Sequence, residues 1–199
     1  MCNFCEGQRE ESIEVTEDNL YLMLNEVTTA ALQAAASYSN GWFHGAKGLG
    51  SDMILKWGLP GAVRLAYVWG AASYFLPRPP DAPTLQFGHS EATEFARKTT
   101  GHEPDASLMA RIVSASDQAG AVMRAIVEAS AKDDPEKIME ELEPLNGSDT
   151  VRALMSLLMG EAGIRLRYAE DQDDELLMDL FMAHVHAAIT ASECGHGDG

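Results

Sequence analysis

The sequence predicts an all-α protein, a single-domain bundle of six or seven helices with a central buried apolar helix. Apolar residues recur at helical spacing through most of the 199 residues, and no convincing run alternates in the manner of a strand. Helix-start residues precede most of these stretches. The 46% hydrophobic content is typical of a globular chain, and the length favours one domain. We expect a helical domain at 16–192, with an N-terminal tail at 1–15 and a C-terminal tail at 193–199.

The first helix is expected to begin at an N-cap, Thr16, followed by two acidic residues. It should end near Ser39-Asn40-Gly41. One face carries apolar residues throughout, namely Leu20, Leu24, Val27, Ala31, Ala35 and Tyr38. The segment that follows, 40–51, contains four glycines, a content that predicts a loop.

The stretch from Trp57 to Leu76 is almost entirely apolar and therefore must be tested as a membrane segment. The Gly58-Leu59-Pro60-Gly61 sequence breaks it, and Arg64 places a charge near its middle. The continuous helix left after the break has about sixteen residues and spans about 24 Å, which is short of a bilayer core. We interpret this stretch as the central buried helix, with a membrane-associated hairpin as the alternative.

The remaining helices are predicted from their start signals. Pro77, Pro79, Pro80 and Pro83 form an extended connection. Ser90 caps a modest helix to Lys98, and Asp105 caps a longer one with an apolar stripe. Asp134-Pro135-Glu136 starts a short helix that ends at Pro144. Ser148 caps the next helix, and Asp173 or Asp174 opens the last, whose apolar face comprises Leu177, Leu180, Phe181, Val185, Ala188 and Ile189.

The charge is strongly negative and unevenly distributed. With 14 basic and 31 acidic residues, the net charge is −17, which argues against direct nucleic-acid binding. The acidic stretches are Glu6 to Asp18, Asp133 to Asp149 and Glu170 to Asp179, whereas Gly41 to Arg111 is near neutral. These stretches are interpreted as solvated faces or as a surface for a basic partner. Three cysteines and no signal peptide favour a cytoplasmic location.

Two pairs of metal-ligand residue types lie at the two ends of the chain. Cys2 and Cys5 are spaced to hold one ion together, and Cys194 and His196 supply two further ligands. Because domain termini often lie close together, a structural zinc site joining the ends is the candidate metal site, with zinc the candidate cofactor. The alternative is two tails with exposed thiols.

Acidic residues on two predicted helices suggest a second, hard-metal site. Glu136, Glu140 and Glu143 share one face of a short helix, and Glu175 and Asp179 lie one turn apart on the last helix. The segment Glu175-Leu-Leu-Met-Asp179-Leu-Phe resembles the acidic helix of all-α nucleotide pyrophosphatases of the MazG type. This resemblance implies a Mg²⁺-dependent enzyme, although that family spaces its carboxylates as E-x-x-E and E-x-x-D. The alternative interpretation is a solvent-facing acidic surface.

Ten methionines, most of them in the C-terminal half, fill core gaps or line an adaptable groove. Our leading hypothesis is therefore a non-enzymatic interaction or assembly protein. It would dock a partner protein or its own copy through an apolar surface rimmed by acid, with no direct contact to nucleic acid or membrane. The alternatives are the pyrophosphatase and an acidic DNA mimic that inhibits a nucleic-acid enzyme, with Asp171, Asp173 and Asp174 in the mimicking surface.

Overall fold

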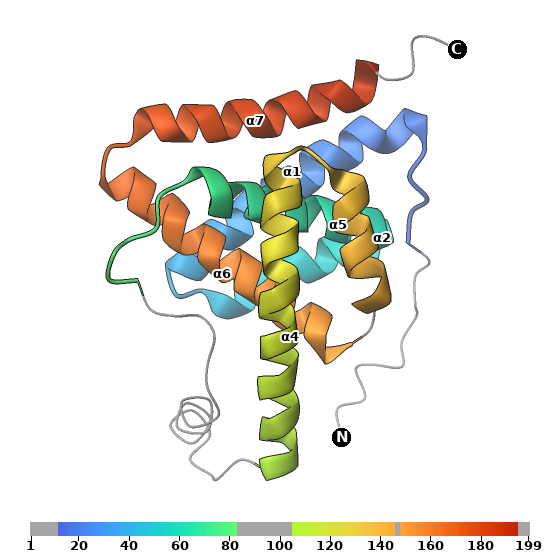
Figure 1. Cartoon of the computed structure of the whole chain (residues 1–199). Coiled ribbons are helices and arrows are strands. Elements are labelled where there is room, and N and C mark those ends of the chain that lie inside the picture. The colour runs from blue at the N-terminus through green and yellow to red at the C-terminus, as the bar shows by residue number, and fades with distance from the viewer. Residues whose placement is uncertain (1–11, 83–104, 146–147, 195–199) are drawn as a thin grey trace.

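A computed structural model of the chain describes residues 12–82, 105–145 and 148–194. These residues form an all-α bundle and contain no strand, as the sequence predicts. Six α-helices in the described ranges pack together and share one hydrophobic core, with a short 3₁₀ turn after α5 (Figure 1). They are α1 (Glu17–Ser39), α2 (Phe43–Phe75), α4 (Ala106–Ala131), α5 (Pro135–Leu142), α6 (Asp149–Asp171) and α7 (Glu175–Cys194).

The helix ends follow local side-chain chemistry, as expected. Thr16 and Asn19 form a capping box at the start of α1, and Gly41, at a φ of 82°, follows the end of that helix. Asp105 accepts a hydrogen bond from the Ser107 amide at the start of α4. Asp134 caps α5, and Ser148 caps α6. The predicted helix from Ser90 to Lys98 lies outside the described residues.

The loop predicted at 40–51 is wrong, because α2 already begins at Phe43 and includes Gly45, Gly48 and Gly50. Each glycine costs a helix interior about 1 kcal/mol relative to alanine, and buried packing can exceed that cost. Ala46 is completely buried, and Leu49 and Met53 pack against the core. These tertiary contacts therefore outweigh the low helix propensity of the glycines.

The predicted break before Pro60 is present as a kink at Gly58, which has φ 61° and ψ −142°. The Lys56 carbonyl oxygen lies at this kink, and it accepts a hydrogen bond from the Ile13 amide at 2.7 Å. A Cβ at Gly61 would lie 2.7 Å from the Met53 carbonyl oxygen, so only glycine fits at this position. The kink thus depends on two glycines as well as on the proline.

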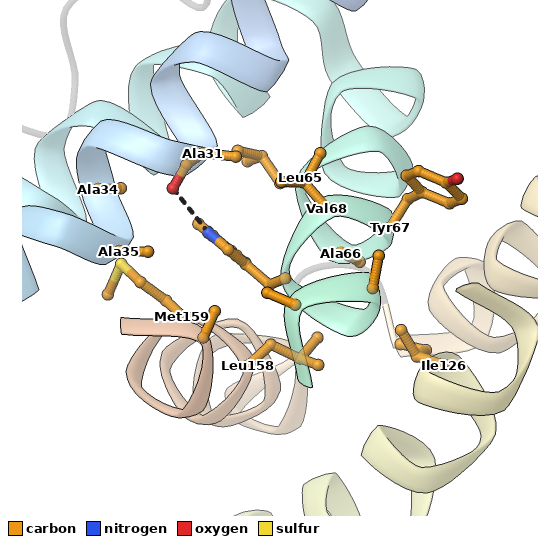
Figure 2. Close-up of a cluster of buried hydrophobic side chains, with 14 of the residues drawn as sticks. Ala31, Ala34, Ala35, Leu65, Ala66, Tyr67, Val68, Ile126, Leu158 and Met159 are labelled. Atoms are coloured by element: carbon orange, nitrogen blue, oxygen red, sulfur yellow. Dashed lines mark hydrogen bonds between the residues drawn. The ribbon is translucent and has the colours of Figure 1, made fainter. Parts of the chain in front are cut away.

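The second half of α2 is the centre of the core, as predicted. Every residue from Leu65 to Ser73 is buried, as is Arg64. Figure 2 shows α2 side chains, including Leu65 and Val68, beside the small residues Ala31, Ala34 and Ala35 of α1. The Trp69 indole donates to the Ala31 carbonyl at 2.9 Å. No helix in the described ranges is long and apolar enough to cross a membrane.

Small residues also bring α1 close to α6. A Cβ at Gly163 would lie 2.5 Å from the Ala35 carbonyl oxygen, so the two backbones are nearly in contact. Met159 of α6 lies next to Ala35 in the same cluster (Figure 2). We call this region, where α1 packs on the second half of α2 and on α6, the alanine seam. Alanine and glycine allow the helix axes to lie near each other in this seam.

The last helix, α7, lies across one end of the bundle (Figure 1). It packs against α2, α6 and, less extensively, α1. The preceding turn places Asp173 at a φ of 56°, and α7 starts at Glu175, close to the predicted start. Of the methionines, Met23, Met109 and Met159 are buried in the bundle, while Met139 on α5 is exposed.

Candidate functional site

The residues of the predicted zinc site fall mostly outside the described part of the chain. Cys2, Cys5 and His196 are not described, and Cys194 is the last residue of α7, with no side-chain description. Within the described ranges, no group of three or more His, Cys, Asp or Glu side chains could hold a metal ion. The terminal zinc site therefore stays a prediction.

The two carboxylate helices do not face each other as the magnesium hypothesis requires. α5 packs against α2 and α4, whereas α7 packs against α2, α6 and α1. Glu136, Glu140 and Glu143 are exposed, as are Glu175 and Asp179 on α7. Lys137 pairs with Glu140 and with Glu141, each at 3.1 Å. These acids line solvated helix faces in the described structure.

A polar cluster holds the middle of α7 to the core. His184 of α7 places Nε2 2.9 Å from the Tyr67 hydroxyl and 3.0 Å from the Ser130 carbonyl oxygen. A carbonyl oxygen only accepts, so the Ser130 contact assigns a hydrogen to Nε2. The imidazole also stacks on the Tyr67 ring, with centroids 5.8 Å apart, and touches Phe75. These contacts attach His184 to α2 and α4.

Arg64 provides a second attachment beneath the same helix. Its Nε donates to Thr28 Oγ1 at 2.9 Å, and its Nη2 reaches the Val185 carbonyl oxygen of α7 at 3.4 Å. The guanidinium also lies 4.8 Å from the centre of the Tyr67 ring. Burial lowers the pKa of Arg64 to about 10, while the electrostatic effects of Tyr67 and Asp133 act in the opposite direction and raise it. At neutral pH this residue remains a buried cation.

Burial also raises the pKa of Tyr67, and the negative charge of Asp133 raises it further. The phenol therefore stays protonated across the physiological range. A neutral tyrosine hydroxyl, a charged arginine and a histidine together satisfy the polar groups beneath α7. Among the described residues, no buried side-chain nitrogen or oxygen lacks a hydrogen-bond partner. The cluster is thus suited to holding the helix, and its hydrogen-bonding groups are already occupied.

The inner face of α7 is apolar and buried. Phe181 and Val185 are completely buried, and Ile189 is 4% exposed. They lie at i, i+4 and i+8, which places them on one side of the helix. These three residues agree with the apolar face that the sequence predicts for this helix.

The opposite face of α7 is also apolar, but it faces solvent. Leu176 is 72% exposed and Leu180 is 54% exposed, and both Ala183 and Ala187 are exposed. At 100° per residue these four positions lie within roughly 60° of one another. We call Leu176, Leu180, Ala183 and Ala187 the outer stripe. The prediction that Leu180 lies on the buried face is wrong, because the helix turns Phe181 and Val185 inward and leaves Leu180 outside.

The outer stripe was missed because one apolar face was expected on a surface helix. Spacings of four, three and four between its members would have revealed a second apolar face in the sequence. The surroundings of this stripe are acidic. From Tyr168 to Cys194 the chain has seven acidic residues and neither lysine nor arginine. Asp179 lies beside the stripe, one residue before Leu180.

Comparison with known proteins adds no assignment to this geometry. The carboxylates that carried the resemblance to nucleotide pyrophosphatases, Glu175 and Asp179, are exposed beside the outer stripe. The chain matches no protein family, no characterised protein and no solved structure.

Proposed function

We propose that this protein is a protein–protein interaction module whose outer stripe on α7 receives a basic amphipathic helix of another protein. The observation that carries this proposal is that α7 is apolar on both faces while only one face is covered by the bundle. Phe181 and Val185 are buried, whereas Leu176 and Leu180 on the other side are exposed. A helix that is apolar all round is normally buried on all sides.

The outer stripe has the chemistry of a helix-binding surface. Contiguous apolar surface on a soluble domain is typical of interaction sites, whereas single exposed apolar residues are common everywhere. The four side chains follow i, i+4, i+7 and i+11 spacing, which matches the apolar face of a partner helix packed alongside. The two alanines at the C-terminal end of the stripe, Ala183 and Ala187, allow a partner backbone to approach closely there.

The negative charge around the outer stripe favours a basic partner. The seven acidic residues between Tyr168 and Cys194 have neither lysine nor arginine among them, and the whole chain carries −17. A second copy would place like charges opposite one another, at a cost that salt reduces but does not remove at short range. A helix with lysine or arginine beside its apolar face meets opposite charge instead. The proposal is therefore a basic helix and not a homodimer.

A designed peptide provides the test. The probe is a helical peptide with leucine at i, i+4, i+7 and i+11 and lysine on the flanking positions, titrated by fluorescence anisotropy. We expect saturable binding that weakens with added salt. The double variant Leu176→Ser/Leu180→Ser should weaken binding by at least tenfold, because burial of one leucine side chain is worth about 1.5–3 kcal/mol.

The chain offers a matched control, since Leu55 on α2 is 71% exposed, almost as much as Leu176. Leu55→Ser should leave the affinity unchanged within a factor of two. A peptide with glutamate in place of lysine should bind far more weakly. Equal loss with Leu55→Ser, equal binding of the acidic peptide, or a dimer that depends on Leu180 would each reject the proposal.

The terminal zinc site is a separate proposal, supported by the ligand types of Cys2, Cys5, Cys194 and His196. Zinc here would be structural, because four protein ligands leave no open position for a substrate. Metal analysis of the purified full chain tests it directly. One equivalent of zinc, lost with Cys5→Ser, is expected. Less than about a tenth of an equivalent, with both N-terminal thiols reactive, would reject it.

A further inference from the structure

The acidic residues near the outer stripe are concentrated at one of its two ends. Four of them lie between Asp173 and Asp179, at the end that carries the two leucines of the stripe. From Leu180 to Cys194 the chain contains one acidic residue, Glu193, and neither lysine nor arginine. The stripe therefore has an acidic leucine end and a nearly uncharged alanine end.

The basic residue of α6 that lies closest in sequence to the acidic end is already engaged. Arg167 donates to the Ser39 carbonyl oxygen at 3.2 Å, and its Nε lies 3.8 Å from an oxygen of Asp171. Glu175 and Asp179 are both exposed, and neither forms an ion pair with another residue of the described ranges. Their carboxylates are therefore accessible to basic side chains of a partner.

These two carboxylates flank the stripe on one side. Glu175 and Asp179 are four residues apart, so they lie about one turn apart along α7. At 100° per residue, Asp179 lies about 60° and Glu175 about 100° from Leu176, both in the same direction around the helix axis. A partner helix that lies along the stripe meets both carboxylates on one flank, within an axial length of about 6 Å.

The helix dipoles favour one direction for the partner. α7 begins at Glu175, so its N-terminus, with its partial positive charge, lies at the acidic end of the stripe. The C-terminus of a helix carries a partial negative charge, and lysine or arginine in its last turns stabilises that helix. The same residues in the first turns destabilise it. Basic residues at the C-terminal end of the partner would therefore stabilise the partner helix and also pair with Glu175 and Asp179.

We infer that the partner helix docks antiparallel to α7, with its basic residues in its last two turns. This inference rests on the function proposed above, and it specifies the order of the partner's sequence. Apolar residues at four-and-three spacing run along the whole contact, and lysine or arginine follows at the C-terminal end. Parallel docking would require the basic residues in the partner's first turns, where they oppose its own helix dipole.

Two peptides of equal composition test the order of the sequence. Both carry leucine at i, i+4, i+7 and i+11 and have blocked ends. The C-basic peptide has its lysines in the last two turns, the N-basic peptide has them in the first two turns, and glutamine occupies the other flanking positions. In fluorescence anisotropy titrations the C-basic peptide should bind at least about fivefold more tightly, since several terminal charges act together. Added salt should reduce this difference.

Paramagnetic broadening of methyl resonances tests the direction. With a nitroxide on the C-terminal end of the C-basic peptide, the methyl groups of Leu176 and Leu180 should broaden more than those of Ala183 and Ala187. With the nitroxide on the N-terminal end of the same peptide, the order should reverse. This readout does not depend on how helical each free peptide is.

Charge reversal at Asp179 tests the ion pairing, with a matched control on α5. Asp179→Lys should weaken binding of the C-basic peptide by about fivefold or more. Replacing two lysines of that peptide by glutamate should restore binding to this variant. Glu136→Lys changes the net charge equally, at an exposed residue in the first turn of α5, and it should weaken binding by less than twofold. Thermal melts establish that both variants are folded.

The inference is overturned if the N-basic peptide binds as tightly as the C-basic one, if the broadening pattern is the reverse of that expected, or if Glu136→Lys weakens binding as much as Asp179→Lys. The first two outcomes leave the proposed function in place, because the stripe still binds a basic helix. If neither peptide binds, or if Leu176→Ser/Leu180→Ser leaves binding unchanged, the proposed function and the inference are both rejected.

Discussion

The alanine seam and α7 show two ways in which a helix can be attached to a bundle. In the seam, small residues bring backbones nearly into contact, and the Trp69 indole bonds to a carbonyl of α1. On α7, large side chains bury one face, and a polar cluster around His184 adds the directional contacts. The side chains that meet in the seam, among them Ala31 and Ala35, are buried, whereas Leu176 and Leu180 on the outer stripe of α7 are exposed. The buried seam contributes to stability, and in the function proposed above α7 presents the interaction surface.

The largest effect is expected from a cavity beside the seam. Leu158 on α6 is completely buried and belongs to the central cluster (Figure 2). Leu158→Ala should lower the free energy of unfolding by about 2–5 kcal/mol, because the cavity adds to the lost burial. Urea unfolding measures this, and Leu55→Ala, at an exposed site, should change it by less than about 0.5 kcal/mol. Equal effects of the two variants would contradict the described packing.

A smaller loss is expected from adding one methyl group within the seam. In Gly163→Ala the new Cβ would lie 2.5 Å from the Ala35 carbonyl oxygen, so the helices must move apart, at a cost of about 1–3 kcal/mol. Gly45→Ala is the matched control, since nothing lies within 4 Å of its Cβ position in α2. It should stabilise the protein by about 0.5–1 kcal/mol. A stabilising Gly163→Ala would show that the backbones are not in close contact.

The attachment of α7 is tested by Tyr67→Phe. This change removes the hydroxyl that lies 2.9 Å from His184 Nε2, and it should cost about 1 kcal/mol at neutral pH. Amide hydrogen exchange should become faster in the middle of α7 and stay unchanged in α1, because α7 opens separately from the seam. Equal acceleration in both helices would mean that they unfold as one unit.

The same variant should change the response to alkaline pH. The pKa of Tyr67 is raised in the folded protein, so the unfolded chain loses this proton first. The stability that Tyr67 contributes is complete below its ordinary pKa of 10.0 and decreases above it. Arg64 has the opposite effect, because burial lowers its folded pKa from 12.5 to about 10. Burying its charge destabilises the fold at neutral pH, and this destabilisation decreases as the pH rises from about 10 to 12.5. The difference in unfolding free energy between Tyr67→Phe and the wild type should therefore shrink above pH 10, in urea titrations at each pH. A constant difference would contradict the raised pKa.

The smallest effect on stability is expected at the outer stripe. Leu176→Ser removes an apolar side chain that is 72% exposed, so the unfolding free energy should change by less than about 0.5 kcal/mol. Phe181→Ser, on the buried side of the same helix, should destabilise by several kilocalories per mole. Thermal or urea unfolding of the two variants measures the difference. Comparable losses would mean that Leu176 is already covered.

The fold class and most helix ends could be predicted because they depend on local chemistry. Asp105, Asp134 and Ser148 cap helices through side-chain bonds to amides within three residues, and at the start of α1 the Asn19 side chain accepts from the Thr16 amide. The helical path of Gly45 and Gly48 could not be predicted, since it depends on neighbours distant in sequence. The exposure of Leu180 was likewise unpredictable from α7 alone. That helix carries two apolar faces, and its own residues do not specify which one the bundle covers.

The most direct test of the proposed interaction surface is an NMR titration of methyl-labelled protein with the basic amphipathic peptide. We predict that the methyl groups of Leu176, Leu180, Ala183 and Ala187 shift or broaden together at one saturating concentration. The methyl groups of Leu55 and of Leu22, another exposed leucine at 59%, should stay unchanged. Peptide-dependent shifts centred on Leu55 or Leu22, with the outer stripe unaffected, would contradict the account.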